Sequence, residues 1–476
     1  MPRARHVVAR GVSLDEASEE AHIHLSVVAR VPGAHAGAVL AVAALDDPDP
    51  DARFPWFVST SVDGTVSTWH VEERGAGGIE LVRDASFGDD DAPWWCLAVD
   101  DEWLFAGTHG RKVKVRLAVD ADLESLPGAI ANHTGWVRAL ASVRKTPREL
   151  ERARAVRPRK ASPRKAKSQS ASAAADDATP PPTTGDAWRF SAACNVVRVW
   201  QDSFAFDEDD EDDEDDGAVA DVGSASIFTG DILCLAGVRA SFRGERFLIA
   251  GVADGTVRGW RVREAPEAPL GTDGSLGTDA PVMLPIREFA DLRGGRVAAL
   301  FPLSEAFPDD DVLSRFVVAG CRDGALGCVD AETMRVSPRI AAHVRRRSSE
   351  TETRRTTKGV ACVCAGPANT VASGGDDGIV RLWRPRVRRE HEVGDEPINT
   401  FSTCVVLEPC GGDIDTVCPD ALTDDTKIET RSHGDRAAPS HGTRCLCAVR
   451  DKRSGECFGA LAGDEAGGLA LYSVFV

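Results

Sequence analysis

A repeating alternation of apolar and polar residues runs along most of the chain. In a typical unit an apolar stretch leads into an Asp-Gly turn, and an alternating stretch follows that ends in Trp. Examples are SVDGTVSTW at 61–69, VADGTVRGW at 252–260 and SGGDDGIVRLW at 373–383. Asp and Gly tolerate the positive φ of a tight turn, and alternation is typical of a half-buried strand. Each unit therefore predicts a strand, a tight turn and a second strand.

Further copies of the unit diverge from this pattern. Residues 321–329 have Val in the place of Trp, residues 195–200 are one residue shorter at the turn, and 107–115 and 463–472 are looser copies. Upstream of the units, a small residue followed by an aliphatic one recurs in one register. The pairs are Ala41-Val42, Cys96-Leu97, Ala139-Leu140, Cys234-Leu235, Ala299-Leu300, Cys362-Val363 and Cys445-Leu446. This register explains the four cysteines as small buried residues rather than metal ligands.

Repeats of about 40 residues, each with several strands, are typical of a β-propeller. The units resemble WD40 repeats, the transducin-like family. The resemblance implies an all-β fold, a seven-bladed WD40-type β-propeller whose blades each run d, a, b, c. It also implies a His in the d–a turn, Ser or Thr in strand b, Asp in the b–c turn and Trp in strand c.

The family's four positions can be matched blade by blade. Blade one has His35, Ser59, Asp63 and Trp69; blade three has His133 and Trp200; blade four has Asp254 and Trp260; blade five has Asp323; and blade six has Ser373, Asp377 and Trp383, with His343 as its nearest histidine across an insertion. The resemblance implies that such residues stabilise single blades. The paired carboxylates Asp376 and Asp377 are then explained as turn residues rather than as a metal loop or an acid pair.

The two ends of the chain predict how the ring closes. Residues 468–476 form a strand of the c type with nothing after it, whereas residues 22–31 alternate without strands a to c before them. Pairing 22–31 as strand d of the last blade closes the ring and protects its outer edge. We therefore expect an N-terminal tail at 1–21 and a single propeller over 22–476.

Charged and polar insertions interrupt the blades. They are the basic, Ala- and Pro-rich segment 144–186, the acidic run 207–216, and the polar stretches 345–358 and 410–440. The charged segments cannot bury a core, so we expect disordered charged insertions there, whereas the two polar stretches are expected to be loops. The blade order places 144–186 between strands a and b and 207–216 between strands c and d of blade three, side by side on one face. The polar stretches are d–a loops and emerge on the opposite face.

The basic part of the first insertion, 144–167, allows two interpretations. It is either a nucleic-acid-binding or nuclear-import segment, or a solvated loop that pairs loosely with the acidic run 207–216. The second is favoured, because the acids compete with phosphates and no aromatic residue interleaves the basic cluster. The net charge of −19 is correspondingly uneven along the chain.

Enzyme, metal and membrane signals are weak. No HExxH spacing, phosphate loop or nucleophile elbow occurs, so no catalytic residue and no cofactor are predicted. A zinc site from the pairs 362/364 and 445/447 is conceivable, but the repeat register explains these cysteines without a metal. No apolar run of membrane-spanning length occurs. With no secretory signal, the 13 cysteines indicate reduced thiols in a cytoplasmic or nuclear protein.

These features favour a non-enzymatic scaffold that binds proteins or peptides. Residues at the start of strand a and at the b–c turn are expected to line one mouth of the propeller. They are Trp136, Asp231, Arg296, Arg322 and Asp376, together with Val62 and His109. Trp136 is either an exposed anchor or a Trp packed between blades.

Other function classes stay open. One is a nucleic-acid-associated protein of RNA processing or ribosome assembly that uses the basic insertion. Another is a ubiquitin-ligase substrate receptor, because residues 260–263 and 383–386 resemble the family's Trp-Asp-x-Arg, although both lack the Asp. An enzyme would need a convergent polar cluster that the sequence does not show. The sequence does not fix the oligomeric state.

Overall fold

The structure is a computed structural model of the whole chain. It describes residues 24–45, 52–74, 78–89, 93–100, 103–117, 123–125, 133–144, 187–200, 221–226, 230–240, 244–264, 281–293, 295–345, 356–357, 359–391, 401–410 and 442–475. The predictions for the tail 1–21, for the basic segment 144–167 beyond Arg144 and for the acidic run 207–216 lie outside these residues. The same holds for 410–440 beyond Cys410.

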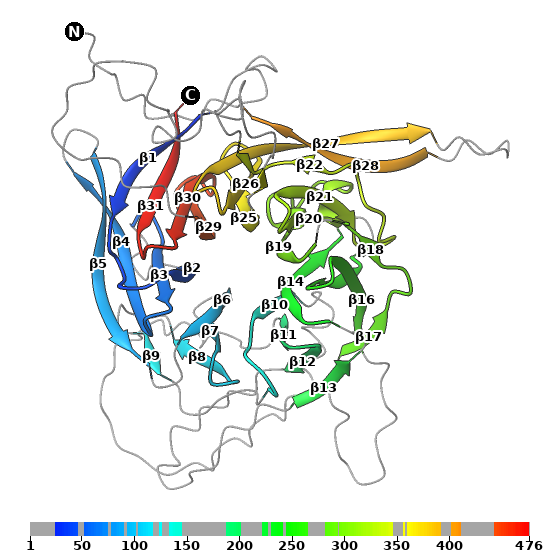
Figure 1. Cartoon of the computed structure of the whole chain (residues 1–476), viewed down its shortest axis with the longest axis horizontal. Coiled ribbons are helices and arrows are strands. Elements are labelled where there is room, and N and C mark those ends of the chain that lie inside the picture. The colour runs from blue at the N-terminus through cyan, green and yellow to red at the C-terminus, as the bar shows by residue number, and fades with distance from the viewer. Residues whose placement is uncertain are drawn as a thin grey trace, which may run out of the picture.

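Seven antiparallel sheets are arranged around one axis, which confirms the predicted all-β, seven-bladed propeller (Figure 1). In chain order, blade one comprises β2 (Val39–Leu45), β3 (Trp56–Ser61), β4 (Thr65–Arg74) and β5 (Gly78–Gly88), and blade two β6 (Trp94–Asp100), β7 (Trp103–Thr108), β8 (Val113–Leu117) and β9 (Glu124–Ser125). Blade three comprises β10 (Ala139–Arg144), β11 (Ala187–Ala193), β12 (Val196–Trp200) and β13 (Asp221–Ser226).

The remaining blades follow the same order. Blade four comprises β14 (Ile232–Arg239), β15 (Arg246–Val252), β16 (Thr256–Glu264) and β17 (Pro281–Pro285), with β18 (Ala290–Asp291) also paired to β16, and blade five comprises β19 (Val297–Pro302), β20 (Phe316–Cys321), β21 (Ala325–Asp330) and β22 (Ile340–Ala341). Blade six comprises β25 (Val360–Gly366), β26 (Thr370–Gly375), β27 (Val380–His391) and β28 (Phe401–Pro409), and blade seven β29 (Thr443–Arg450), β30 (Cys457–Asp464), β31 (Leu469–Phe475) and β1 (His24–Val31).

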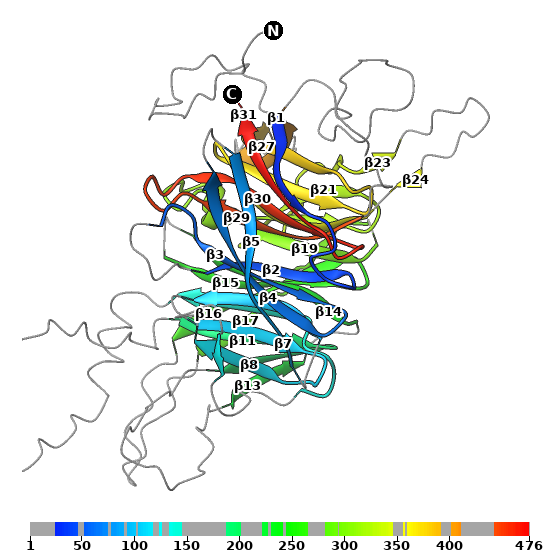
Figure 2. The ribbon, with the colours of Figure 1, turned by 90° about the vertical axis from the view of Figure 1, so that its left-hand side faces the viewer.

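The first strand of each blade is its innermost strand (Figure 1), and these strands contact one another in turn around the axis. Figure 2 shows the same disc from its side. In the described residues, the helices are two short 3-10 turns, η2 (Leu303–Glu305) and η3 (Leu313–Arg315). No described helix is long and apolar enough to cross a membrane.

The small-then-aliphatic register marks where neighbouring blades pack together. In six blades a β-bulge directly precedes the small residue, as between Trp94 and Cys96. In five of these blades strand b places a glycine opposite the small residue, whereas blade one has Thr60 there. A Cβ at Gly107 would lie 2.5 Å from the Cys96 sulfur and 2.7 Å from a Val137 methyl of the next blade. The Cys96 thiol lies 3.6 Å from the carbonyl oxygen of Val137. A small residue is therefore required because the next blade approaches closely.

Blade seven is built from both ends of the described chain. Strand β1 pairs antiparallel with β31, from His24 opposite Phe475 to Val31 opposite Leu469. Blades one and seven also meet through Arg53, whose Nε donates to Asp451 at 2.7 Å. These contacts join the first and last blades, and they hold the ring shut without a covalent link.

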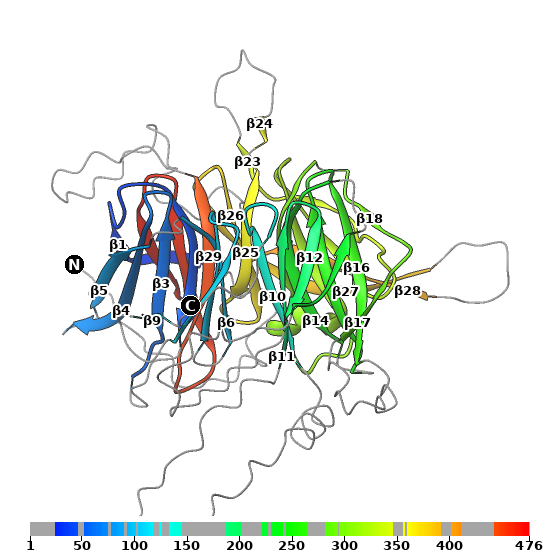
Figure 3. The same cartoon turned by 90° about the horizontal axis from the view of Figure 1, so that it is seen from below.

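Two ribbons extend beyond the regular blades. Strands β27 and β28 run outward past the rim (Figure 1), and the amide of Val405 donates to the hydroxyl of Ser337 in blade five at 3.1 Å. The second ribbon lies at the ends of the polar loop predicted at 345–358. Its ends pair as β23 (Val344–Arg345) and β24 (Thr356–Thr357), which stand out from one side of the disc (Figure 3). This side is the face of the d–a loops and b–c turns.

Candidate functional site

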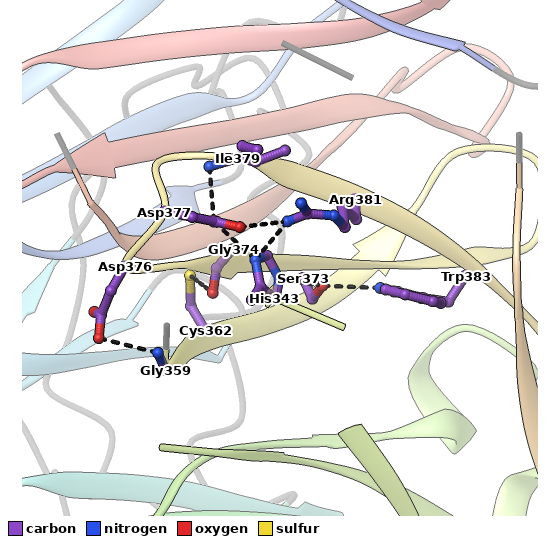
Figure 4. Close-up of polar contacts among 10 residues, drawn as sticks. All are labelled: His343, Gly359, Cys362, Ser373, Gly374, Asp376, Asp377, Ile379, Arg381 and Trp383. Atoms are coloured by element: carbon purple, nitrogen blue, oxygen red, sulfur yellow. Dashed lines mark hydrogen bonds and ion pairs between the residues drawn. The ribbon is translucent and has the colours of Figure 1, made fainter. Parts of the chain in front are cut away.

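Side chains from four segments of blade six form one hydrogen-bonded set (Figure 4). The hydroxyl of Ser373 accepts from the Trp383 indole at 2.8 Å and lies 2.9 Å from Nε2 of His343. The Nδ1 atom of His343 lies 2.9 Å from Asp377, which also pairs with Arg381 at 2.7 Å. His343, Ser373, Arg381 and Trp383 are buried. The insertion that separates His343 in sequence does not separate it in space.

The charge states within this set favour the folded blade. Burial of the Asp377 carboxyl favours its protonated form, but hydrogen bonding to His343 and the charges of His343 and Arg381 outweigh this effect. The pKa of Asp377 falls to about 2 as a result. Burial lowers the pKa of His343 despite the neighbouring carboxylate. These groups are used inside the blade, so their perturbed pKa values do not mark a reactive site.

Blade one has a similar set, with Thr65 between the histidine and the aspartate and with Ser67 at the strand position of Arg381. Ser59 lies 2.7 Å from Nε2 of His35 and accepts from the Trp69 indole at 2.8 Å. Nδ1 of His35 contacts the hydroxyl of Thr65, which donates to Asp63 at 2.6 Å. Asp63 therefore reaches the histidine through Thr65, and its other oxygen accepts from the backbone of the d–a loop.

The residue type at one position of strand b divides the seven blades into two groups. Serine lies at one register position in blades one, three and six, where Ser191 of blade three lies 2.8 Å from Nε2 of His133. Alanine lies at this position in the other four blades, namely Ala106, Ala250, Ala319 and Ala462. The strand-b hydroxyl thus occurs in the blades in which the structure shows a buried histidine beside it.

The other predicted blade residues have simpler environments. Asp254 accepts from the backbone and hydroxyl of Thr256, and Asp323 accepts from the amide of Ala325. Trp260 is buried in the core between blades three and four. Trp200 pairs with Arg189 in the strand ladder, and the structure does not describe its side chain.

Blade two is a complete four-stranded blade stabilised by an ion cluster. Arg116 occupies the place of the strand-c Trp and lies 2.9 Å from Asp89, whose other oxygen is 2.6 Å from Lys114. The Arg116 guanidinium also lies over the rings of Phe87 and Trp94. Because the Asp89 side chain is only 2% exposed, this cluster forms part of the blade's interior.

A repeated backbone hydrogen bond brings the two predicted mouth positions together. The residue after strand b donates to a residue just before strand a of its own blade, at 2.9–3.0 Å. The donor–acceptor pairs are Val62–Ala38, His109–Pro93, Ala253–Asp231, Arg322–Arg296, Asp376–Gly359 and Glu465–Gly442. The d–a face is therefore edged by side chains from these two positions.

The five predicted face residues all lie at this mouth, but they do not form one cluster. Asp231 and Arg296 are exposed and sit in the hydrogen-bonded pairs of blades four and five. Arg322 and Asp376 form an ion pair at 3.0 Å between blades five and six. Trp136 lies apart from these residues, at the start of blade three.

Trp136 belongs to an aromatic cluster that the sequence prediction identified only in part. Its ring stacks on Trp95 at 5.6 Å with planes 7° apart, and its centroid lies 4.5 Å from that of His109. The Arg138 guanidinium lies 5.5 Å from the Trp136 ring and 5.8 Å from that of Trp95. Trp136 still exposes 40% of its surface, so it is both packed on blade two and open to solvent. The position directly before the small residue, occupied by Trp95 in the bulge of β6 and by Arg138 just before β10, was the missed signal.

The described cysteines give no metal site. All of them have free thiols, and no group of three or more potential ligands occurs among the described residues. Burial raises the pKa of Cys96 and Cys447 to about 12, and it raises that of Cys362 and Cys364 as well. These thiols are protonated packing groups at neutral pH.

Comparisons with known proteins agree with this architecture. Residues 349–384 match the family model described as "WD domain, G-beta repeat". The chain is similar to a solved structure titled "Crystal structure of RRP9 WD40 repeats", with 12% identity and a TM-score of 0.50, covering 95% of this chain and 98% of that chain. A structure titled "Structure of U3-55K" has 12% identity and a TM-score of 0.49, covering 94% and 98%. No curated protein sequence matches the chain. At this identity the structural likeness shows the fold alone.

Proposed function

Because the chain is a WD40-type β-propeller, we propose that it is a non-enzymatic scaffold that binds other proteins or peptides within a larger complex. The binding surface is the d–a face, and Trp136 is its anchor. The observation that carries the proposal is the stacked, half-exposed cluster of Trp95, Trp136, His109 and Arg138 at the mouth of blades two and three.

The composition and rigidity of this cluster support its role in binding. Trp and Arg are enriched among residues that dominate binding energy at protein interfaces. Trp136 is held by Trp95 and His109, so a partner would lose little side-chain entropy on contacting it. An exposed Trp on a rigid disc is therefore suited to take up a partner's apolar side chain.

The buried polar groups support a non-enzymatic role. The carboxylate of Asp377, whose pKa falls to about 2, is directed at His343 and Arg381 inside blade six rather than at the mouth. At the mouth itself, Arg322 and Asp376 pair with each other. Perturbed groups mark catalysis when they face a cleft, and these groups stabilise the blades instead.

The alternatives have less support in the described residues. A ubiquitin-ligase receptor role rests on Arg263 and Arg386, but Arg386 lies 3.7 Å from Glu408 on the outer ribbon. A nucleic-acid role through 144–167 stays a prediction from the sequence. We place the protein in the cytoplasm or nucleus, which the free thiols of the described cysteines support.

Affinity capture with matched variants tests the scaffold proposal. The bait is the full chain, compared with Trp136→Ala, with a chain lacking 144–186 and 207–216, and with a Val387→Ala control. Val387 is 42% exposed on the outer ribbon against 40% for Trp136, so both substitutions truncate an apolar side chain of similar fractional exposure. Each lysate is used with and without nuclease.

The scaffold proposal expects the same protein partners with the full chain, the Val387→Ala control and the deletion, and their loss with Trp136→Ala. Loss of the partners on nuclease treatment or on deletion of the charged insertions would instead assign the function to the basic segment. If the same partners are still captured by the Trp136→Ala variant, Trp136 is not the anchor of the binding surface.

A further inference from the structure

We propose that Arg111, Arg138 and Trp136 bind a short acidic peptide of a partner protein, with carboxylates on the two arginines and an apolar side chain against Trp136. The inference rests on the proposed scaffold function and specifies the partner's chemistry. Three independent features of blades two and three support it: a strained backbone position, an altered turn and two cations that have no acidic partner among the described residues.

The backbone at Arg111 adopts a conformation that suits glycine. Its φ is 67°, in the left-handed region, where a residue with a Cβ is disfavoured. The amide at this turn position donates to the carbonyl three residues earlier, at 3.3 Å in Arg111 and at 3.0–3.3 Å in the equivalent glycines. Those glycines are Gly64, Gly255, Gly324, Gly378 and Gly467, all with positive φ. Blade two therefore keeps an arginine where five other blades have glycine.

The turn itself does not need the arginine side chain. The carbonyl of Arg111 accepts from the amide of His133 at 2.8 Å, a contact that glycine would make equally well. The guanidinium has no hydrogen-bond or ion-pair partner among the described residues, and the residue is exposed. Backbone strain without a local structural benefit is typical of functional positions.

The same turn also changes the charge of the surface. Blades one, four, five and six have an Asp directly before the glycine, namely Asp63, Asp254, Asp323 and Asp377, whereas blade two has Gly110 before Arg111. A carboxylate is thus absent and a guanidinium is present at the one turn that lies beside His109 and Trp136. The change favours an anionic ligand at this point of the mouth.

Arg138 supplies the second cation. It is exposed, forms no ion pair with a described residue, and lies over the rings of Trp95 and Trp136. Stacking on the indoles fixes the guanidinium but leaves its N–H donors free for a carboxylate. Two arginines repel cationic ligands, so the aromatic rings are unsuited to a lysine- or arginine-bearing partner.

The surroundings favour a peptide over a nucleic acid. Exposed Asp63 in blade one and Asp231 in blade four flank the cluster on its two sides. A nucleic-acid strand that crosses several blades would bring its phosphates against these carboxylates, whereas a short peptide fits between them. The Trp136 ring is also already in contact with Trp95 and His109, which leaves less of it for stacking bases.

The test measures binding by fluorescence polarisation on the full chain. The probes are a short fluorescein-labelled peptide of alternating glutamate and leucine, the same peptide with lysine for glutamate, and an oligouridine. The variants are Arg111→Gly, Arg138→Ala and Trp136→Ala, with Val387→Ala as the control. Arg111→Gly is the decisive variant, because glycine relieves the strain and the Tm should stay at or above that of the unsubstituted chain.

The proposal expects the glutamate peptide to bind, the lysine peptide not to bind, and Arg111→Gly to weaken binding by about tenfold without loss of Tm. Equal affinity with Arg111→Gly, equal binding of the lysine peptide, tighter binding of the oligouridine, or no binding of the glutamate peptide at about 1 mM would each overturn it. The two proposals can fail independently. If captured partners depend on Trp136 but not on Arg111, the scaffold proposal stands and the acidic-peptide proposal fails.

Discussion

At the scale of single residues, the hydroxyl of Ser373 connects strand b, strand c and the d–a loop of blade six. Replacing it by alanine removes the partner of the Trp383 indole and of the His343 ring, and both groups stay buried. A buried donor left without a partner costs about 1–3 kcal/mol. We expect Ser373→Ala to lower the free energy of unfolding by about 2 kcal/mol, measured by urea denaturation.

An exposed serine gives the control for this prediction. Ser454 lies in the loop between β29 and β30 and is exposed. Ser454→Ala should change the unfolding free energy by less than about 0.5 kcal/mol. Equal effects of the two substitutions would show that the hydrogen-bonded set of blade six does not stabilise the fold.

The buried histidines predict a dependence of stability on pH. Burial, with a smaller effect of Arg198, lowers the pKa of His133 from 6.5 to about 4. Below pH 6.5 the unfolded chain therefore binds a proton that the folded chain does not, so stability falls as the pH falls toward 4. Between about pH 7 and pH 5, His133 should account for a loss of about 2 kcal/mol.

Urea denaturation of the unsubstituted chain and of His133→Gln at the two pH values checks this assignment. The variant should be less stable at pH 7 and should lose less stability on acidification. His35 and His343, whose pKa values burial also lowers, leave a remaining pH dependence. An unchanged pH dependence in the variant would contradict the role given to His133.

Arg111 and Gly255 occupy equivalent turns and predict opposite effects on stability. Relief of the left-handed strain in Arg111→Gly should raise the unfolding free energy by up to about 1 kcal/mol, net of the greater entropy of glycine in the unfolded chain. Gly255→Ala should lower it, because the φ is 93° and the new Cβ would lie 2.9 Å from the Gly295 carbonyl oxygen. Denaturation of both variants decides the point, and a loss of stability in Arg111→Gly would argue against strain.

At this scale the sequence is most informative where the chemistry is local. The turn aspartates and the strand-c Trp residues follow from short motifs, because each motif forms one turn. His343 reaches blade six only because the two ends of the insertion that follows it lie close together in space. The link from Asp63 to His35 through Thr65 depends on side-chain geometry. Neither can be read from spacing alone.

At the scale of elements, the contact between neighbouring blades sets the sequence of strands a and b. A Cβ at Gly107 in β7 would lie within 3.0 Å of the Cys96 sulfur and of two Val137 atoms. Overpacking of this kind costs about 1–3 kcal/mol. Gly107→Ala should therefore destabilise the fold by about that amount in a thermal or urea unfolding measurement.

Gly88 provides the matched control for this substitution. It ends β5, and a Cβ there would meet nothing within 4 Å, so Gly88→Ala should be close to neutral. If Gly107→Ala is equally neutral, the packing account of the small-residue register is wrong.

The sequence predicted the regular elements better than the irregular ones. Strands a, b and c follow from a hydrophobic pattern that is repeated seven times, so weak copies are supported by strong ones. The ion cluster of Arg116 and Asp89 has no counterpart in the other motifs and could not be inferred from them. The short ladder at the ends of 345–358 has no hydrophobic pattern, so the sequence predicted a polar loop there rather than a pair of strands.

At the scale of the whole molecule, the fold and the binding face differ in how far the sequence determines them. The repeat fixes the propeller because each blade uses the same local pattern. The face depends on which residues of different blades come together, as Trp95 of blade two and Trp136 of blade three do. One rigid disc hosts many functions, so the function depends on such groupings rather than on the fold.

The most direct test of the scaffold account is photo-crosslinking in living cells from a single residue of the d–a face. An aromatic photoreactive amino acid, which keeps an aromatic ring at the anchor, is placed at position 136 in one chain and at position 387 in another, since the two native side chains have similar fractional exposure. The account predicts a discrete crosslinked protein from position 136 and none from position 387. Equal crosslinking from both positions, or crosslinks to nucleic acid from position 136, would contradict it.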